Sequence, residues 1–440
     1  MNWIIREARI LLPEGEIEGD AWIKDGRWAA VGRVPDHARG KTFLAQGAYL
    51  LPGLIDTHVH FREPGLTHKG TFYTESRAAL AGGVTTTFDM PNTVPPTTSL
   101  AAWEAKLRQV AHKSWTNFAL YFGATEANLP DIRQLDPHRV PGVKVFLASS
   151  TGDLLVTDEG YVRRLMQESP VRLVFHSEKE ALIQAAHRLW QGADWAEVPD
   201  LHTRVRPSEA CIESTRWLLT EAKHSAVPLH ILHITTAREV QLLRHRPPHV
   251  SAETCPIYLQ WNAGDFPHYK NLLKCNPAPK YPSDQEALWQ GLVEGTIAVV
   301  GTDHAPHTWA EKQRSYWDAP SGAPAHGYLL PWLWTLGRQR GLSISFWVEK
   351  MVYAPARLWK LRQRGAIQEG NWADAVIFSP DGETVVPLPH ASQHYGRVAW
   401  SPLSGLRLEG EVRAVWVNGS LSFSQGYFHA PPVGAVVDFA

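Results

Sequence analysis

The stretch DTHVHFREPG, residues 56–65, directly follows an apolar run at residues 49–55 and guides the interpretation of the rest of the chain. It places His58 and His60 one residue apart, with Arg62 two residues further on. On an extended chain, side chains at positions i and i+2 point to the same side. The two imidazoles can therefore bind one metal ion together, and Arg62 can face the same space.

The length, composition and net charge are those of an ordinary globular protein. Its 440 residues suit either a large barrel-type domain with an accessory unit or two to three ordinary domains. It contains 44% hydrophobic and 20% charged residues, with a formal net charge of −1 and no block of like charges. The start of the chain does not resemble a signal peptide, and no apolar window approaches the roughly 18 residues of a spanning helix. We therefore expect a cytoplasmic protein with a small-molecule substrate and with neither a nucleic-acid nor a membrane partner.

The three cysteines show no spacing typical of a zinc knuckle or a disulfide framework. Cys211, Cys255 and Cys275 make an odd count and form no CxxC pair. We interpret them as buried small hydrophobic residues.

Both ends of the chain are rich in short β-strand patterns. The runs are residues 21–24 and 27–31 around Asp25-Gly26, and residues 373–378, 412–417 and 420–423, the last two separated by Asn418-Gly419. Asp-Gly and Asn-Gly pairs between such runs are strong signals of β-hairpins. We expect one small β-sandwich domain formed by both termini, with residues 1–52 as its N-terminal part and residues 361–440 as its C-terminal part.

Between these ends, apolar or β-branched runs alternate with helical stretches such as residues 100–112 and 208–223, which is typical of βα units and a parallel sheet. The candidate strands are residues 49–55, 84–89, 118–122, 142–146, 171–176, 229–233, 250–254 and 297–302. Eight strands of this kind predict a (β/α)₈ TIM-type barrel, which we place at residues 53–360.

Groups that bind metals gather at the ends of these strands, where a barrel of this kind carries its active site. They are His58 and His60 after the first strand, Lys144 in the fourth, His176 and His233 ending the fifth and sixth, and Asp303 after the eighth. Nitrogen and oxygen ligands without thiolates suit Zn²⁺ or a related divalent ion at a catalytic site. A lysine buried among apolar neighbours must be paired or chemically altered, because a lone buried ammonium is costly.

Five motifs in one order carry a resemblance to a known family. They are HVHFREPG (58–65), DMPNT (89–93), GVKVFLASSTG (142–152), KCNPAPK (274–280) and GTDHAPH (301–307). Together with the metal-binding residues they resemble the amidohydrolase superfamily, and within it the dihydroorotases of the cyclic-amidase branch. The resemblance runs from about residue 53 to residue 356 and includes the two β-rich ends.

The resemblance implies a cofactor and a set of ligands. Two divalent ions, with Zn²⁺ the expected metal, would be bridged by Lys144 after its amine has been carboxylated by CO₂. His58, His60 and Asp303 would hold one ion, and His176 and His233 the other. The ions would share a hydroxide, and Asp303 would be the catalytic general base.

The resemblance also implies the substrate, which would be N-carbamoyl-L-aspartate, cyclised reversibly to (S)-dihydroorotate in de novo pyrimidine biosynthesis by a homodimeric enzyme. Arg62 offers a bidentate fork for the substrate carboxylate. Asn92 and His307 would complete this clamp, and Asn276 would contact the ring. Relatives that act on hydantoins or allantoin have no such carboxylate to bind, so we expect them to replace Arg62 and His307.

Two alternatives stay open for the function as a whole. One is a hydantoinase or allantoinase, since residues 321–331 differ from the usual stretch near the substrate ring. The other is a catalytically inactive, dihydroorotase-like scaffold, although a scaffold has no reason to keep Lys144 and Asp303 together.

Individual residues also have simpler interpretations. Arg62 could form a structural salt bridge with Glu63, and Lys144 could pair with an acid or reach solvent. Asn92 and Asn276 could each serve a turn beside the proline next to them. Two sets are interpreted as structural. His230 is a packing histidine, while Tyr161, Arg163, Arg164 and residues 178–180 are solvated helix surfaces.

Overall fold

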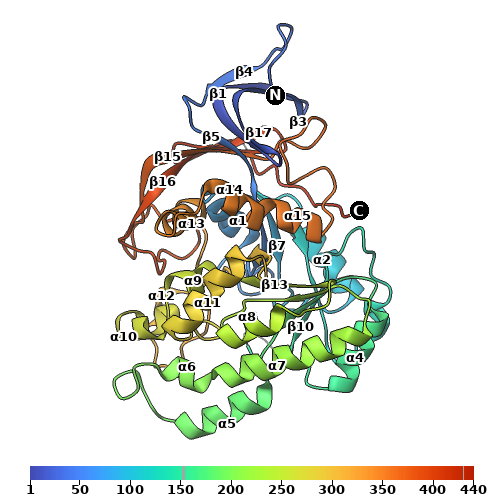
Figure 1. Cartoon of the computed structure of the whole chain (residues 1–440), viewed down its shortest axis with the longest axis vertical. Helices are drawn as coiled ribbons and strands as arrows, with labels where there is room; N and C mark the ends of the chain where they lie inside the picture. Colours follow the sequence, from blue (N-terminus) through green and yellow to red (C-terminus); the bar gives the residue numbers. More distant parts are fainter. Residues whose placement is uncertain (151–153, 430) are drawn as a thin grey trace.

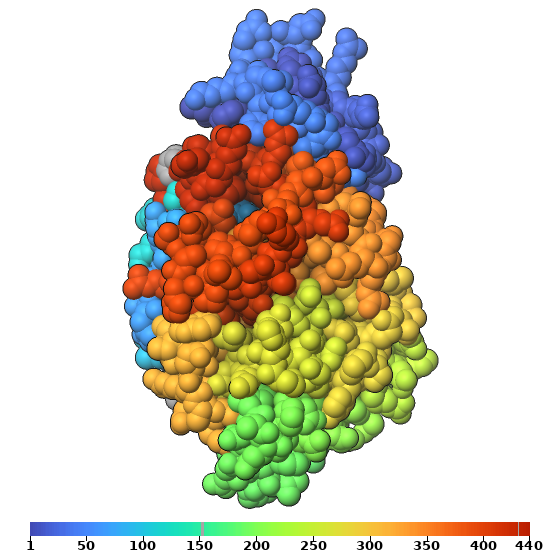
Figure 2. Space-filling view, turned by 90° about the vertical axis from the view of Figure 1, so that its left-hand side faces the viewer, coloured from blue at the N-terminus to red at the C-terminus, as the bar shows by residue number. Residues whose placement is uncertain are grey.

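The structure is a computed structural model that describes residues 1–150, 154–429 and 431–440. It has two parts, a β-sheet built from both ends of the chain and a barrel surrounded by helices (Figure 1). The space-filling view shows N-terminal residues, in blue, at one end of the molecule and residues from the middle of the chain, in green, at the other (Figure 2).

The terminal sheet interleaves strands from the two ends of the chain. Its strands are β1 (Trp3–Leu12), β2 (Gly15–Lys24), β3 (Arg27–Gly32), β4 (Lys41–Leu44), β5 (Tyr49–Pro52), β15 (Ala375–Val385), β16 (Arg407–Val417), β17 (Ser420–Ser424) and β18 (Tyr427–Phe428). They follow the order β18-β17-β16-β15-β5-β1-β2-β3, with β4 beside β1. Strand β15 thus pairs directly with β5, although more than 300 residues separate them.

The two predicted hairpins in this sheet have the backbone geometry that their sequences favour. Asp25 and Gly26 have φ values of 52° and 82°, and Asn418 and Gly419 have φ values of 49° and 74°. Positive φ at both central residues is the requirement of a type I′ turn, which Asp-Gly and Asn-Gly meet at little cost. The two turns lie against each other, because a Cβ on Gly419 would be only 2.5 Å from the Cα of Gly26.

The barrel consists of parallel strands in two hydrogen-bonded groups. Its strands are β6 (Leu54–Val59), β7 (Val84–Asp89), β8 (Asn117–Leu120), β9 (Phe122–Gly123), β10 (Val143–Phe146), β11 (Leu173–His176), β12 (Leu229–Ile231), β13 (Val250–Thr254) and β14 (Val299–Val300). One group runs β6-β7-β8 and the other β9 to β14 in sequence order. A parallel bridge between Val59 and His304 joins the first strand to the end of the last. The predicted fold class, a TIM-type barrel with a β-sandwich from both termini, is confirmed.

The first predicted strand, residues 49–55, is two strands rather than one. Strand β5 belongs to the terminal sheet and β6 to the barrel, and the chain passes from one to the other at Gly53. A Cβ at Gly53 would lie 2.1 Å from the hydroxyl oxygen of Thr85, so only glycine fits there. A continuous apolar run could not show this break, because both strands are fully buried.

Helices cover the outside of the barrel (Figure 1). They are α1 (Phe72–Ala81), α2 (Leu100–Val110), α3 (Leu129–Ile132), α4 (Glu159–Glu168), α5 (Glu180–Trp190), α6 (Leu201–Val205), α7 (Ser208–Glu221), α8 (Ala237–Leu243), α9 (Pro256–Gln260), α10 (Phe266–Tyr269), α11 (Pro282–Val293), α12 (Trp309–Lys312), α13 (Leu329–Arg338), α14 (Ile344–Val348) and α15 (Ala354–Leu358), with 3₁₀ turns η1 (Ala222–His224), η2 (Ala263–Asp265) and η3 (Lys270–Leu273) and a π-helix η4 (Glu349–Tyr353). Several of these helices begin at a residue whose side chain caps the first turn. Ser99 caps α2, and Thr236 forms a capping box with Glu239 in α8. Among the described residues, no helix combines the length and the apolar character needed to cross a bilayer.

The C-terminal segment returns to the barrel after leaving the terminal sheet. Val436 forms a parallel bridge with Phe118, and Phe439 forms an antiparallel bridge with Leu361. Val437 and Phe439 are 1% and 3% exposed, in a cluster with side chains of β7, β11 and β14. Both ends of the chain therefore contribute to the sheet, while the C-terminal segment also closes the barrel core.

Candidate active site

Four histidines form a row across the carboxyl-terminal end of the barrel. His58 and His60 lie at the end of β6, His176 ends β11, and His233 follows β12. Ring centroids are 5.5 Å apart for His60 and His58, 5.5 Å for His58 and His233, and 4.7 Å for His233 and His176. All four rings are buried. The structure therefore brings together histidines from three separate strands.

Asp303 lies against one end of this row. Its Oδ1 is 3.1 Å from Nε2 of His60 and 3.3 Å from Nε2 of His58. Ligand atoms of these three residues all lie within 4.8 Å of one another, a spacing that can hold a metal ion. Asp303 adopts a φ of 50° and His233 a φ of 38°, both in the left-handed region that non-glycine residues rarely occupy. Such strain is typical of functional sites.

The outer nitrogens of His58 and His60 are fixed by hydrogen bonds. Nδ1 of His58 donates to Oε1 of Glu253 at 2.6 Å, and Nδ1 of His60 donates to Oδ1 of Asn92 at 2.7 Å. With the proton on Nδ1, each Nε2 carries its lone pair toward Asp303. This is the arrangement that holds metal-binding imidazoles in one tautomer and one orientation.

On the other side, His176 is held in the same way, and His233 lies against it. Nε2 of His176 donates to Oε2 of Glu178 at 2.7 Å, so its Nδ1 is free to bind and lies 3.0 Å from Nε2 of His233. Nδ1 of His233 has no hydrogen-bond partner among the described residues. Two nitrogens that converge at this distance, with one lone pair already directed inward, suit a shared cation.

Lys144 is buried beside these rings. Its ammonium lies 4.5 Å from the ring centroid of Phe146, and it forms no salt bridge with an acid in the described part of the chain. Burial lowers the pKa of Lys144 to about 7, although Asp303 and Glu253 oppose this shift. At neutral pH a substantial fraction of this amine is therefore uncharged.

Burial and charge set the protonation of the ligands as metal binding requires. Burial lowers the pKa of His60 to about 4, so the imidazole is neutral at pH 7. Burial alone would raise the pKa of the Asp303 carboxyl, but the imidazoles of His58 and His60, in their protonated form, outweigh it and hold that pKa far below its usual range. Neutral imidazole and ionised carboxylate are the metal-binding forms.

Glu178 is a functional residue that the sequence interpretation missed. It was expected on a solvated helix surface, but it is fully buried and binds both His176 and the guanidinium of Arg206. Arg206 outweighs burial and holds the pKa of Glu178 well below its ordinary value. Its position two residues after His176 was the available signal. Tyr161 is buried as well, on the inner side of α4, so that expectation is also wrong.

The predicted substrate residues lie around a small cavity next to the candidate metal ligands. It is lined by His60, Arg62, Asn92, Ser150, Asn276, Asp303, Ala305, Ser321 and Gly322. Oδ1 of Asn276 is buried and has no partner among the described residues. His307 does not line this cavity directly. It lies behind it, where its Nε2 is 3.0 Å from Nη2 of Arg62 and 2.9 Å from the carbonyl oxygen of Ser321.

Arg62 does not form the salt bridge with Glu63 that offered a simpler interpretation. Glu63 instead pairs with Lys113 and accepts a hydrogen bond from the backbone of Phe72. The guanidinium of Arg62 donates from Nε to the carbonyl of Pro306 at 3.1 Å and is 2% exposed. Burial lowers its pKa to about 10, so it stays charged at neutral pH.

Two further expectations are confirmed. His230 is a satisfied packing histidine, with Nδ1 bonded to Ser251 and Nε2 to Glu253. The three cysteines are free and buried.

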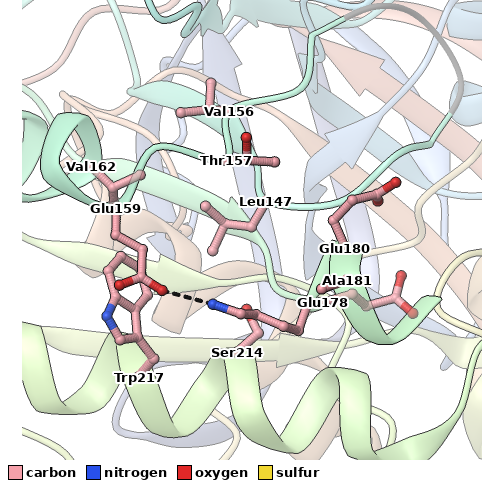
Figure 3. Close-up of a pocket in the computed structure, with 11 residues that line it drawn as sticks. Leu147, Val156, Thr157, Glu159, Val162, Glu178, Glu180, Ala181, Ser214 and Trp217 are labelled. Atoms are coloured by element: carbon pink, nitrogen blue, oxygen red, sulfur yellow. Dashed lines mark hydrogen bonds and ion pairs between the residues drawn. The ribbon is translucent and has the colours of Figure 1, made fainter. Parts of the chain in front are cut away.

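A larger hollow lies beside the candidate metal site, between α4, α7 and the start of α5 (Figure 3). An ion pair between Glu159 and Lys179 crosses it, and Trp217 forms part of its wall. Glu178 also lines it, so this side chain separates the hollow from His176.

Comparison with known proteins places these features in a family. The model of the amidohydrolase family matches residues 49–421. An allantoinase of Streptomyces avermitilis is 34% identical, with 97% of each chain covered. A dihydroorotase of Methanothermobacter thermautotrophicus is 32% identical, over 92% of this chain and 90% of that one. Among solved structures, the L-hydantoinase of Arthrobacter aurescens superimposes with a TM-score of 0.92 at 29% identity and covers 99% of each chain.

The match extends over most of the chain and includes every strand that carries a candidate ligand. The three relatives bear the names of different enzymes, an allantoinase, a dihydroorotase and a hydantoinase. The chain belongs to the amidohydrolase family, in the group of cyclic amidohydrolases that contains allantoinases, dihydroorotases and hydantoinases.

Proposed function

We propose that this protein is a dihydroorotase, which interconverts N-carbamoyl-L-aspartate and (S)-dihydroorotate in pyrimidine synthesis. The observation that supports this choice is the buried, charged Arg62 beside the metal ligands, with His307 in contact with it. A buried cation needs an anionic partner, and among these substrates the carboxylate of dihydroorotate supplies one.

The ligand set fits two divalent ions bridged by a carboxylated Lys144. Three histidines have their outer nitrogens fixed by hydrogen bonds, and the inner nitrogens converge. Lys144 is buried without an acidic partner in the described residues, and its uncharged amine is the form that adds to CO₂. His58, His60 and Asp303 would hold one ion, and His176 and His233 the other, with Lys144 between them. Such a pair of ions, when bound, supplies a water nucleophile at neutral pH.

The remaining steps belong to side chains of this protein. Asp303 is ionised and stands at the edge of the cavity, so it can take the proton of the attacking water. It then passes this proton to the ring nitrogen as the C–N bond of the amide breaks. Arg62 holds the substrate carboxylate, while Asn92 and Asn276 line the side where the ring would lie.

A second candidate function is the opening of allantoin or a hydantoin ring. It is favoured by the 34% identity to an allantoinase over nearly the whole chain and by the close superposition on a hydantoinase. These rings lack a carboxylate at the position in question, so Arg62 would have no substrate partner.

The test compares dihydroorotate, allantoin and hydantoin as substrates of one metal-replete preparation. We expect dihydroorotate to give the highest kcat/KM, and Arg62→Met to lower that value by about two orders of magnitude, because a charge-assisted hydrogen bond is lost. Arg413→Met, in the terminal sheet, is the matched control and should leave the value unchanged. Preference for allantoin or hydantoin, or an Arg62→Met variant that keeps full dihydroorotate turnover, would overturn the assignment.

Metal analysis separates an enzyme from an inactive scaffold. We expect two divalent ions per chain in protein prepared without chelator, and fewer than one ion would support the scaffold. We also propose that the protein is a cytoplasmic homodimer, which mass measurement in solution and localisation of the tagged protein would test.

A further inference from the structure

The ring nitrogens of His307 lie within hydrogen-bond distance of three polar partners that cannot all be satisfied at once, and Oε2 of Glu311 lies further away, 4.0 Å from Nδ1. Its Nδ1 lies 3.1 Å from Nζ of Lys69, and its Nε2 lies 3.0 Å from Nη2 of Arg62 and 2.9 Å from the carbonyl oxygen of Ser321. Lysine and arginine only donate hydrogen bonds, and a carbonyl only accepts them. A neutral imidazole has one N–H and one lone pair, so its tautomer decides which of these contacts are favourable.

The tautomer with the proton on Nε2 satisfies two contacts. Lys69 then donates to the lone pair of Nδ1, and Nε2–H donates to the carbonyl of Ser321. The opposite tautomer, with the proton on Nδ1, satisfies only the contact with Arg62. It places Nδ1–H against the ammonium of Lys69 and the lone pair of Nε2 against the carbonyl oxygen of Ser321. Burial lowers the pKa of His307 well below its ordinary value, which keeps the ring neutral.

The ammonium of Lys69 is fixed by an ion pair with Glu311. Its Nζ is 3.0 Å from Oε1 of Glu311, whose other oxygen is fixed by the backbone and hydroxyl of Thr308. The Lys69 side chain is 10% exposed. The ammonium therefore has a fixed counter-ion and directs a further N–H at His307.

We propose that Lys69 is a positioning residue that sets the tautomer of His307 and so prepares Arg62 for the substrate. In the tautomer that Lys69 favours, His307 cannot accept the Nη2–H of Arg62, and two N–H groups face each other. The Nη2–H of Arg62 then has no acceptor on His307 and stays available for an anionic oxygen in the cavity that Arg62 lines. This proposal rests on the proposed function, since the anion is taken to be the carboxylate of dihydroorotate.

The consequence of losing Lys69 is that His307 can turn into an acceptor. With Lys69→Met, the proton can move to Nδ1, and Nε2 can then accept from Arg62. The arginine donor would be occupied before the substrate arrives. We expect KM for dihydroorotate to rise on the order of tenfold to a hundredfold, with kcat changed much less, as for loss of one charged hydrogen bond.

The experiment combines enzyme kinetics with an NMR measurement of the His307 tautomer. KM and kcat are measured for dihydroorotate and for 5,6-dihydrouracil, the same ring without the carboxylate, in the wild type, Lys69→Met and Lys69→Arg. The ¹⁵N shifts of His307, assigned with His307→Asn, report its tautomer without substrate. Lys350→Met is the matched control, because Lys350 is also a buried lysine, bonded to the carbonyl of Ile297 two residues before β14.

We expect the Nε2–H tautomer in the wild type and in Lys69→Arg, and a shift toward Nδ1–H in Lys69→Met. The rise in KM should appear for dihydroorotate and not for dihydrouracil. An Nδ1–H ring in the wild type, or equal effects on both substrates, would overturn the proposal. If the wild type does not turn over dihydroorotate, the proposed function is wrong. The ¹⁵N chemical shifts of His307 in the wild type and in Lys69→Met still test whether Lys69 sets its tautomer.

Discussion

Glu253 in β13 connects two histidines through one carboxylate. Its Oε1 accepts from His58 and its Oε2 lies 3.1 Å from Nε2 of His230, which is itself held by Ser251. All of these groups are buried. The orientation of the candidate metal ligand His58 thus depends on a chain of hydrogen bonds that runs from Ser251 through His230 of β12 to Glu253.

Replacing this carboxylate tests that dependence. Glu253→Gln keeps the size of the side chain but removes the charge, so His58 loses its strongest partner. We expect affinity for the divalent metal to fall roughly 10- to 100-fold, measured by competition with a coloured chelator. Glu239→Gln is the matched control, since Glu239 is equally buried but caps α8 and contacts no candidate ligand. Equal metal affinity in the wild type and Glu253→Gln would refute the role of this residue.

Residues at the ends of strands could be found from the sequence, and residues that contact them across long separations of the chain could not. His58, His60, His176 and Asp303 stand next to recognisable strands, and the strand ends put them in one place. Glu253 meets His58 across 195 positions of the chain, and Lys69 meets His307 across 238. Nothing in the local sequence indicates contacts at such separations.

At the scale of elements, strands were predictable where periodicity and turn chemistry agree. Strands β7 and β13 begin and end where the sequence predicts, and the Asn418-Gly419 turn lies between β16 and β17. The division of residues 49–55 at Gly53 was not predictable, because it depends on the nearby Thr85 rather than on the run itself.

The close contact of the two type I′ turns gives a prediction for the terminal sheet. Gly419→Ala adds a methyl group that would clash with Gly26, on top of the cost of φ 74° for alanine. Gly426→Ala carries the same backbone cost at φ 82° but meets no atom within 4 Å. We expect Gly426→Ala to lower the free energy of unfolding by about 1–2 kcal/mol and Gly419→Ala to lower it by clearly more. Urea unfolding measures both, and equal losses would show that the turns do not press on each other.

At the scale of the whole molecule, the C-terminal segment and the barrel stabilise each other. Phe439 packs edge-on against Phe88 at 5.7 Å, and its backbone is hydrogen-bonded to that of His138. These contacts join residues from β7 and from the loop before β10 to the C-terminal segment. The barrel is thus stabilised by side chains from outside its own βα units.

Removing one of these side chains should destabilise the entire protein. We expect Phe439→Ala to lower the free energy of unfolding by about 3–5 kcal/mol, as for other buried aromatic residues. Tyr427→Ala is the matched control, because Tyr427 is 73% exposed and should change stability little. Thermal and urea unfolding would measure both, and a small effect at Phe439 would mean that the segment contributes little to the barrel.

The pairing of β5 with β15 has a consequence for biosynthesis. While a ribosome is still adding residues 53–374, one edge of β5 has no neighbour, and at about 5–20 residues per second this lasts tens of seconds. An unpaired hydrophobic strand can join another nascent chain during that time. Newly made copies should therefore depend on chaperones until the partner strand emerges, and strong overexpression should produce inclusion bodies from otherwise stable protein.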